Sequence, residues 1–105
     1  MHLQRKGYSI IERNYRCSCG ELDLVAYHKE SKTLVFVEVK SRKRGGPVNP
    51  EEALTKAQAN RIKRCAEAFL AETSVSYAEV RFDLIAVELS ADGTPLNTVH
   101  IEDAF

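Results

Sequence analysis

Four charged residues interrupt two short apolar segments of the chain, with a spacing that could place a metal ion beside a lysine. The segments Gly20–Tyr27 and Thr33–Lys40 alternate in polarity and are rich in β-branched residues, which is typical of strands. The charged residues within them are Glu21, Asp23, Glu38 and Lys40. A charge inside an apolar strand costs free energy, so each of these residues indicates a partner or a function.

The polar segment between the two strands predicts a hairpin. Residues 28–33 are polar and turn-forming, so the strands are expected to pair antiparallel, with Tyr27 opposite Leu34. Counting back along both strands from that pair places Asp23 opposite Glu38. Because side chains alternate with period two, the two carboxylates would share one face of the sheet, about 5 Å apart.

Two carboxylates at this separation repel each other unless a positive charge lies between them. Their hard oxygen atoms favour Mg²⁺, Mn²⁺ or Ca²⁺. The same register places Glu21 opposite Lys40, whose ammonium group would point at whatever the ion holds. A metal that polarises a phosphate and activates water, with a lysine that positions the water or stabilises developing charge, is the outline of a phosphodiester-cleaving site.

A simpler interpretation of the same residues is a solvated strand face on which Glu21 and Lys40 form a cross-strand ion pair. Val25, Leu34 and Phe36 fall on that face by parity, so the face would be polar only locally. The apolar neighbours favour a confined site over a solvated face.

The composition is that of one globular domain comprising residues 1–105. Hydrophobic residues make up 44% and charged residues 29% of the 105 residues, enough for a single core. No apolar stretch approaches the roughly 20 residues of a membrane-spanning helix, and the amino terminus lacks the apolar core of a signal peptide. We therefore expect a cytoplasmic location and no membrane partner.

Three cysteines, an odd number without disulfide-framework spacing, fit a reducing compartment. Cys17 and Cys19 form a Cys-x-Cys pair that could hold zinc with His2 or His28. A single such pair is a weak zinc signal. Two reduced thiols flanking a turn remain the alternative.

The charge is unevenly distributed although the net charge is zero. Between Lys40 and Arg64 the chain has eight basic residues and two acidic ones. Contact with phosphates requires such a local basic surface, although a solvated helix face beside a polar loop would explain it too. Our candidates for nucleic-acid contact are Arg42, Lys43, Arg44, Lys56, Arg61 and Lys63. Phosphate contacts carry no sequence information, so the basic residues fit DNA and RNA equally well.

A helix is predicted to follow a loop at residues 41–50. Asn49 can cap it, Pro50 suits its first position, and Glu52 lies three residues after the cap as in a capping box. An apolar stripe of helical period then includes Ala53, Leu54, Ala57, Ile62, Cys65, Ala66, Phe69 and Leu70. The stripe leaves Lys56, Asn60, Lys63 and Arg64 facing outward.

The remaining elements predict an α/β sandwich with a mixed sheet. Residues 3–7 indicate the last turn of a helix, and residues 8–15 a first strand. Residues 80–87 indicate a central strand buried on both faces, and residues 98–101 a short last strand. A helix between the third and fourth strands is a crossover, so those strands are expected to be parallel and the connection right-handed.

Asp23 on the second strand, the segment Glu38-Val39-Lys40 on the third and the αβββαβ order resemble the PD-(D/E)XK nuclease superfamily. More narrowly, five segments are similar to those of the YraN family, which looks related to archaeal Holliday junction resolvases. These segments are Gly7-Tyr8, Glu12 to Arg16, Gly20 to Ala26, Val35 to Lys40 and Arg81 to Asp83.

The resemblance implies a restriction-endonuclease-like αβββαβ core, a mixed sheet flanked by helices. It implies a Mg²⁺-dependent (or Mn²⁺-dependent) endonuclease that hydrolyses phosphodiester bonds in DNA, including branched or recombination intermediates. By that resemblance Asp23 and Glu38 hold the metal with the Val39 carbonyl, and Lys40 is the catalytic lysine. Glu21 belongs to the matching Gly-Glu-x-Asp segment, where it would tune Lys40. Lys56 and Arg61, in a segment similar to the start of the family's Lys-rich helix, would contact phosphate.

One feature departs from the family pattern. Relatives begin with a longer amino-terminal helix whose glutamate would approach the metal, whereas this chain opens at Met1 near the end of that helix. We therefore expect a truncated amino-terminal helix and a partly exposed sheet face, which would favour low stability or a homodimer. The alternative function is a non-catalytic nucleic-acid-binding or protein-interaction domain that keeps the nuclease fold.

Overall fold

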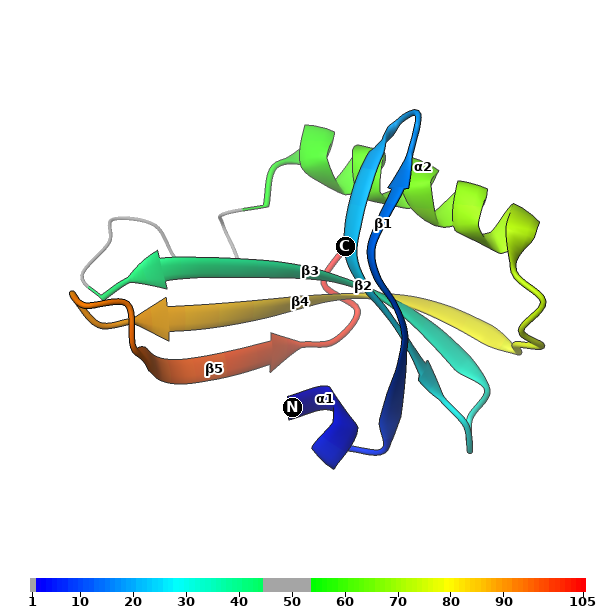
Figure 1. Cartoon of the computed structure of the whole chain (residues 1–105). Coiled ribbons are helices and arrows are strands. Elements are labelled where there is room, and N and C mark those ends of the chain that lie inside the picture. The colour runs from blue at the N-terminus through cyan, green and yellow to red at the C-terminus, as the bar shows by residue number, and fades with distance from the viewer. Residues whose placement is uncertain (1, 45–53) are drawn as a thin grey trace.

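A computed structural model describes residues 2–44 and 54–105, and in it the predicted α/β fold with a mixed sheet is confirmed. One five-stranded sheet has the order β1-β2-β3-β4-β5, and its helices lie on opposite faces (Figure 1). The strands are β1 (Tyr8–Cys17), β2 (Gly20–His28), β3 (Thr33–Lys43), β4 (Glu79–Leu89) and β5 (Pro95–Ile101), and the helices are α1 (His2–Arg5) and α2 (Lys56–Glu72). In the described part of the chain, no helix is both long enough and apolar enough to cross a membrane.

The β2–β3 hairpin has the predicted register. Tyr27 pairs with Leu34, and the ladder continues to the pair Leu24 and Val37. The strands β3 and β4 are parallel, as the crossover through α2 predicts, whereas the other three neighbouring pairs are antiparallel. Because the β2–β3 ladder ends at Leu24 and Val37, the next residues, Asp23 and Glu38, lie just beyond its last pair.

The helix α2 packs on one face of the sheet, and aromatic side chains meet at the interface. Phe36 of β3 is fully buried, meets Phe69 of α2 edge to face at 5.7 Å between ring centroids, and stacks on Phe82 of β4 at 5.6 Å. The opposite face packs against α1, whose Leu3 is fully buried with Val35 and other residues of β2 and β3. Alternate residues of β3 therefore enter two separate cores, as strand geometry dictates.

The helix α2 begins later than the sequence pattern predicts. Thr55 is its N-cap: the Thr55 Oγ1 accepts from the Gln58 N–H, and the Gln58 Oε1 accepts from the Thr55 N–H at 2.9 Å. This is a complete capping box, and a capping box at Thr55 can start a helix as well as the predicted one at Asn49. Leu54 lies before the helix, and Ala57 is exposed, although both were predicted on its buried stripe. The predicted cap residues Asn49, Pro50 and Glu52 lie outside the described residues.

A buried acidic group lies within β4, which the sequence predicts as a central strand buried on both faces. Asp83 is fully buried and receives two hydrogen bonds from the Arg81 guanidinium, each 2.8 Å long. The Asp103 N–H donates to it at 3.0 Å, and His100 Nε2 of β5 lies 2.6 Å away. Burial opposes the charge, but the hydrogen bonds from Arg81 and its neighbours outweigh burial and lower the pKa of Asp83. The network ties the chain after β5 to β4.

Candidate active site

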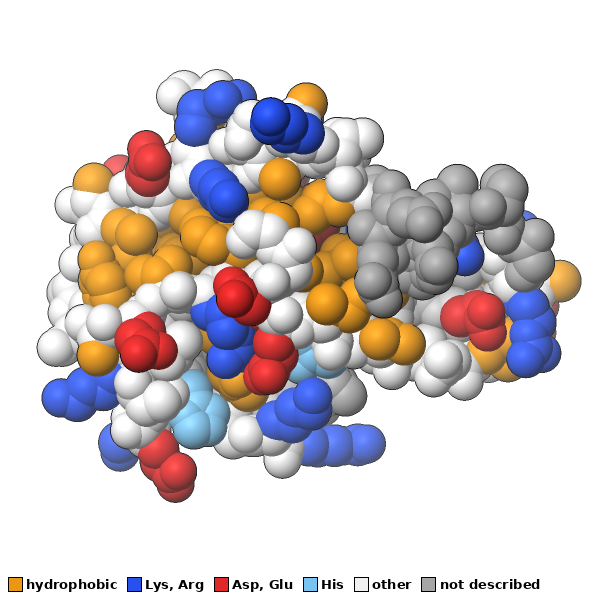
Figure 2. All heavy atoms as spheres, turned by 180° about the vertical axis from the view of Figure 1, so that it is seen from behind, with side chains coloured by type: hydrophobic (Ala, Val, Ile, Leu, Met, Phe, Trp, Pro, Cys, Tyr) orange, Lys and Arg blue, Asp and Glu red, His pale blue; other side chains and the backbone are white. Residues whose placement is uncertain are grey.

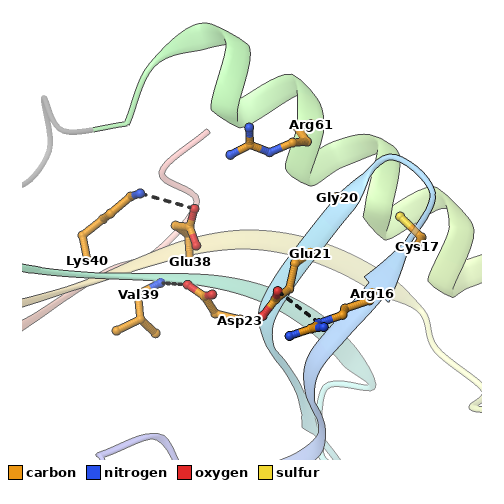
Figure 3. A pocket seen from close by; sticks show the side chains of 9 residues that line it. All are labelled: Arg16, Cys17, Gly20, Glu21, Asp23, Glu38, Val39, Lys40 and Arg61. Atoms are coloured by element: carbon orange, nitrogen blue, oxygen red, sulfur yellow. Dashed lines mark hydrogen bonds and ion pairs between the residues drawn. The ribbon is translucent and has the colours of Figure 1, made fainter.

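The end of the β2–β3 ladder opens into a pocket of about 680 Å³ (Figure 3). Its lining residues are Arg16, Cys17, Gly20, Glu21, Asp23, Glu38, Val39, Lys40 and Arg61. Every residue predicted for catalysis or metal binding thus lies in one pocket. Arg61 reaches the pocket from α2, opposite the strands that carry the carboxylates.

The pocket exists because a side chain takes the place of strand pairing. Asp23 Oδ2 accepts a 2.8 Å hydrogen bond from the Val39 N–H, one step beyond the last pair of the ladder. In an extended strand the N–H and C=O of one residue point to the same side, so the Val39 carbonyl also faces β2. Asp23 therefore satisfies a backbone donor of β3, and its carboxylate also hydrogen-bonds the side chain of Glu38.

Glu38 is a buried acid whose pKa is raised. Its side chain is only 11% exposed, and burial raises its pKa to about 7. Hydrogen bonding and charge repulsion with Asp23 act in the same direction, while Lys40 and Arg61 partly oppose them. The two neighbouring acids thus resist being ionised together, and a divalent cation would relieve that repulsion.

Glu21 and Lys40 do not form the cross-strand ion pair of the simpler interpretation. Glu21 pairs instead with Arg16 on β1, at 3.4 Å between Arg16 Nε and Glu21 Oε2. Lys40 Nζ lies 3.7 Å from Glu38 Oε2 on its own strand. Lys40 is therefore held next to the acidic pair rather than drawn away from it.

Gly20 allows α2 to approach the strands that carry the acids. Its φ of +145° is rarely adopted by other residues, and a Cβ there would lie 2.9 Å from both Cγ and Cδ of Arg61. The glycine therefore leaves the space that the Arg61 side chain occupies beside the pocket. The pocket residues Arg16, Cys17 and Gly20 were not predicted as part of the site, although Arg16 directly faces Glu21 in the β1–β2 register.

The basic residues predicted for nucleic-acid contact divide into two groups. Only Arg61 lines the pocket. Lys43 and Lys56 are exposed at the end of β3 and the start of α2, and Lys63 lies over the Phe82 ring. Arg42 is half-buried, and Arg44 is 3.7 Å from Glu88. Figure 2 shows basic side chains both at the upper edge of the molecule, where α2 lies, and along its lower edge, so the helix is one of several basic regions.

The mixed sheet flanked by helices, with two carboxylates and a lysine where β2 and β3 separate, is the architecture of the restriction-endonuclease-like α/β class. The chain belongs to the uncharacterised protein family UPF0102, the YraN family, whose model matches residues 1–87. The predicted family resemblance is thereby confirmed.

Three similar proteins illustrate the extent of this relationship, and each is called a UPF0102 protein. The one from Geotalea uraniireducens is 38% identical over 104 residues, which cover 99% of this chain and 80% of the relative. The one from Geotalea daltonii is 43% identical over 98 residues, or 93% and 75%. The one from Beutenbergia cavernae is 46% identical over 85 residues, or 81% and 70%. The family name states no activity, so we infer the activity from the site.

Proposed function

We propose that this protein is a metal-dependent endonuclease that hydrolyses phosphodiester bonds in DNA, including branched or recombination intermediates. The observation that carries the proposal is the meeting of Asp23, Glu38 and Lys40 in one pocket where the β2–β3 ladder ends. The pair of acids would bind a cation, and the lysine beside them would contact a phosphate.

The donor atoms of the pocket fit Mg²⁺ or Mn²⁺. Carboxylate and carbonyl oxygens are the ligands these ions prefer, and Asp23, Glu38 and the Val39 carbonyl offer them from adjacent strands. A bound ion would supply Lewis-acid activation of the phosphate and of a water molecule. The high pKa of Glu38 supports the same assignment, because it marks a buried acid without sufficient positive charge nearby.

Basic side chains of the pocket would stabilise the negative charge of the substrate phosphate. Lys40 Nζ, held 3.7 Å from Glu38, can donate to a non-bridging phosphate oxygen and stabilise the charge that develops there. Arg61 on α2 would contact the phosphate from the opposite wall of the pocket. Glu21, which pairs with Arg16, would hold a third cation at the pocket's edge.

The basic surface outside the pocket would hold the nucleic-acid backbone. Lys43, Lys56 and Lys63 are exposed, and Lys63 Nζ lies over the Phe82 ring of β4, 5.8 Å from its centroid. Contacts of this kind position a duplex without reading its sequence. The surface by itself equally suits a domain that binds nucleic acid without cleaving it, so the test must separate cleavage from binding.

The first experiment is a calorimetric titration of the purified chain with Mg²⁺ and with Mn²⁺. Asp23→Asn is the sharpest control, since an amide oxygen can still accept from the Val39 N–H while the carboxylate charge is lost. We expect saturable binding that this variant abolishes. Linear, nicked and four-way-junction DNA are then tested for metal-dependent cleavage.

Two results would count against the proposal. Cleavage that survives in both Asp23→Asn and Lys40→Ala would exclude this site as its source. DNA binding that is salt-sensitive, indifferent to Mg²⁺ and lost when Arg42, Lys43 and Arg44 are replaced by alanine, without any cleavage, would favour the non-catalytic domain.

A further inference from the structure

Three cysteine side chains meet between the β1–β2 turn and α2. The Sγ atom of Cys17 lies 2.6 Å from that of Cys19 and 3.1 Å from that of Cys65, and the remaining distance is 3.5 Å. Cys17 ends β1, Cys19 lies in the turn, and Cys65 is on the buried face of α2. All three thiols are free.

The third cysteine changes the interpretation of the Cys-x-Cys pair. From the sequence, a zinc site at Cys17 and Cys19 would be completed by His2 or His28. Cys65 lies 46 residues beyond Cys19 in the chain, so the local pattern does not connect it with the pair. The structure excludes His28 from the cluster: its Nδ1 bonds Ser31, and its ring packs on Tyr8 near the other end of β2. The fold supplies a thiol where the sequence predicts a histidine.

The arrangement has the chemistry and nearly the spacing of a thiolate metal site. Zn²⁺ binds thiolate sulfur at about 2.3 Å in tetrahedral geometry, which separates the sulfurs by roughly 3.8 Å. The observed separations of 2.6 to 3.5 Å are shorter, so side-chain adjustments of roughly 1 Å would admit the ion. The softness of three sulfur ligands favours zinc over the magnesium expected at the carboxylates.

The surroundings also suit an ion that enters from solvent. Cys65 is fully buried, whereas Cys17 and Cys19 are half-buried and Cys17 lines the pocket. The more exposed side of the cluster therefore leaves the fourth coordination position to water.

We propose that Cys17, Cys19 and Cys65 bind one Zn²⁺ ion and that the ion fastens the β1–β2 turn to α2. The turn carries Gly20, against which the Arg61 side chain packs, so the ion would stabilise the wall of the neighbouring pocket. The proposal does not depend on nuclease activity, because its ligands are separate from the carboxylates.

The test uses Co²⁺ and then Zn²⁺ with the reduced, full chain. Co²⁺ is expected to give a sulfur-to-cobalt charge-transfer band that saturates at one equivalent and is removed by one equivalent of Zn²⁺. Zn²⁺ should raise the melting temperature of the wild-type chain. Cys65→Ala and Cys19→Ser should each lose the band. Cys19 is a half-buried turn residue, so its variant is the one expected to keep the fold if the buried change does not.

Asp23→Asn is the matched control, since it should keep the cobalt band while it loses Mg²⁺ binding. A reduced chain that takes up cobalt without a charge-transfer band, or takes up none, overturns the zinc site. Binding that survives in both cysteine variants overturns it as well. Failure of Mg²⁺ binding with an intact cobalt band would count against the nuclease proposal alone.

Discussion

At the scale of the residue, the electrostatics of the pocket depend on how much positive charge lies near its two neighbouring acids, Asp23 and Glu38. Lys40 and Arg61 both favour ionised Glu38, yet burial and the adjoining Asp23 raise its pKa from 4.5 to about 7. The chain thus places one acid where ionisation is costly and supports the other with a backbone N–H. Strongly perturbed acids cluster at functional sites, and the proposed divalent cation would relieve the repulsion between these two.

The raised pKa predicts that the metal-free chain loses stability as the pH rises from about 4.5 to about 7. In this window the folded state binds more protons than the unfolded state, so the free energy of unfolding falls with pH. The whole shift corresponds to at most about 3 kcal/mol. Urea denaturation in the presence of a chelator, at intervals from pH 4.5 to pH 8, measures the loss. Glu38→Gln should flatten this part of the profile, and an equal slope in that variant would assign the effect to other groups.

Lys40 allows substrate chemistry to be separated from metal binding. Lys40→Ala removes a cation that would act on the phosphate, but it leaves the oxygen ligands in place. We expect kcat for DNA cleavage to fall roughly 100- to 1,000-fold, while the calorimetric affinity for Mg²⁺ stays within a few-fold of wild type. An equal loss of metal binding would mean that Lys40 organises the acids rather than the substrate.

At the scale of the element, the close approach of α2 to the β1–β2 turn depends on Gly20. Gly20→Ala combines an unfavourable φ with a Cβ 2.9 Å from the Arg61 side chain. Gly93→Ala is the matched control, because Gly93 has a φ of +89° but nothing within 4 Å of its Cβ position. Both changes cost backbone strain, and the crowding should make the first roughly 1 to 3 kcal/mol more destabilising in denaturant unfolding.

A double-mutant cycle tests whether contact with Arg61 causes the additional destabilisation of Gly20→Ala. Arg61→Ala removes the atoms that the new methyl group meets, so it should recover most of the difference between the two glycine variants. If Gly20→Ala and Gly93→Ala prove equally costly, the contact between the turn and Arg61 is not tight.

The elements also differ in how much the sequence could predict. The hairpin register followed from alternation and one polar turn, which are local signals, and it placed both acids at the end of the β2–β3 ladder. The start of α2 was mistaken because two capping boxes occur within a few residues and local pattern does not rank them. The buried Asp83 network and the meeting of Cys65 with Cys17 depend on long-range packing, for which the local sequence holds no signal.

At the scale of the whole molecule, a chain of zero net charge carries eight of its 15 basic residues between Lys40 and Arg64, toward the end of β3 and on α2. Exposed Lys43 and Lys56 lie outside the pocket, so they can contact the nucleic-acid backbone without taking part in chemistry. The polarised distribution explains how a neutral protein could still bind a polyanion, since the local potential rather than the net charge governs the encounter.

This surface predicts a particular salt dependence of DNA binding. If Lys43 and Lys56 each neutralise one phosphate, replacing either by alanine should reduce the slope of log affinity against log salt by about 1. Lys29→Ala is the control, because Lys29 is equally exposed but lies in the β2–β3 turn, at the opposite end of β3 from Lys43. Fluorescence anisotropy of labelled duplex and four-way-junction DNA, measured in Ca²⁺ to limit cleavage, gives the slopes. If the slopes of all three variants equal that of the wild-type chain, the DNA binds on another face. The basic side of α2 would then be only a solvated helix surface.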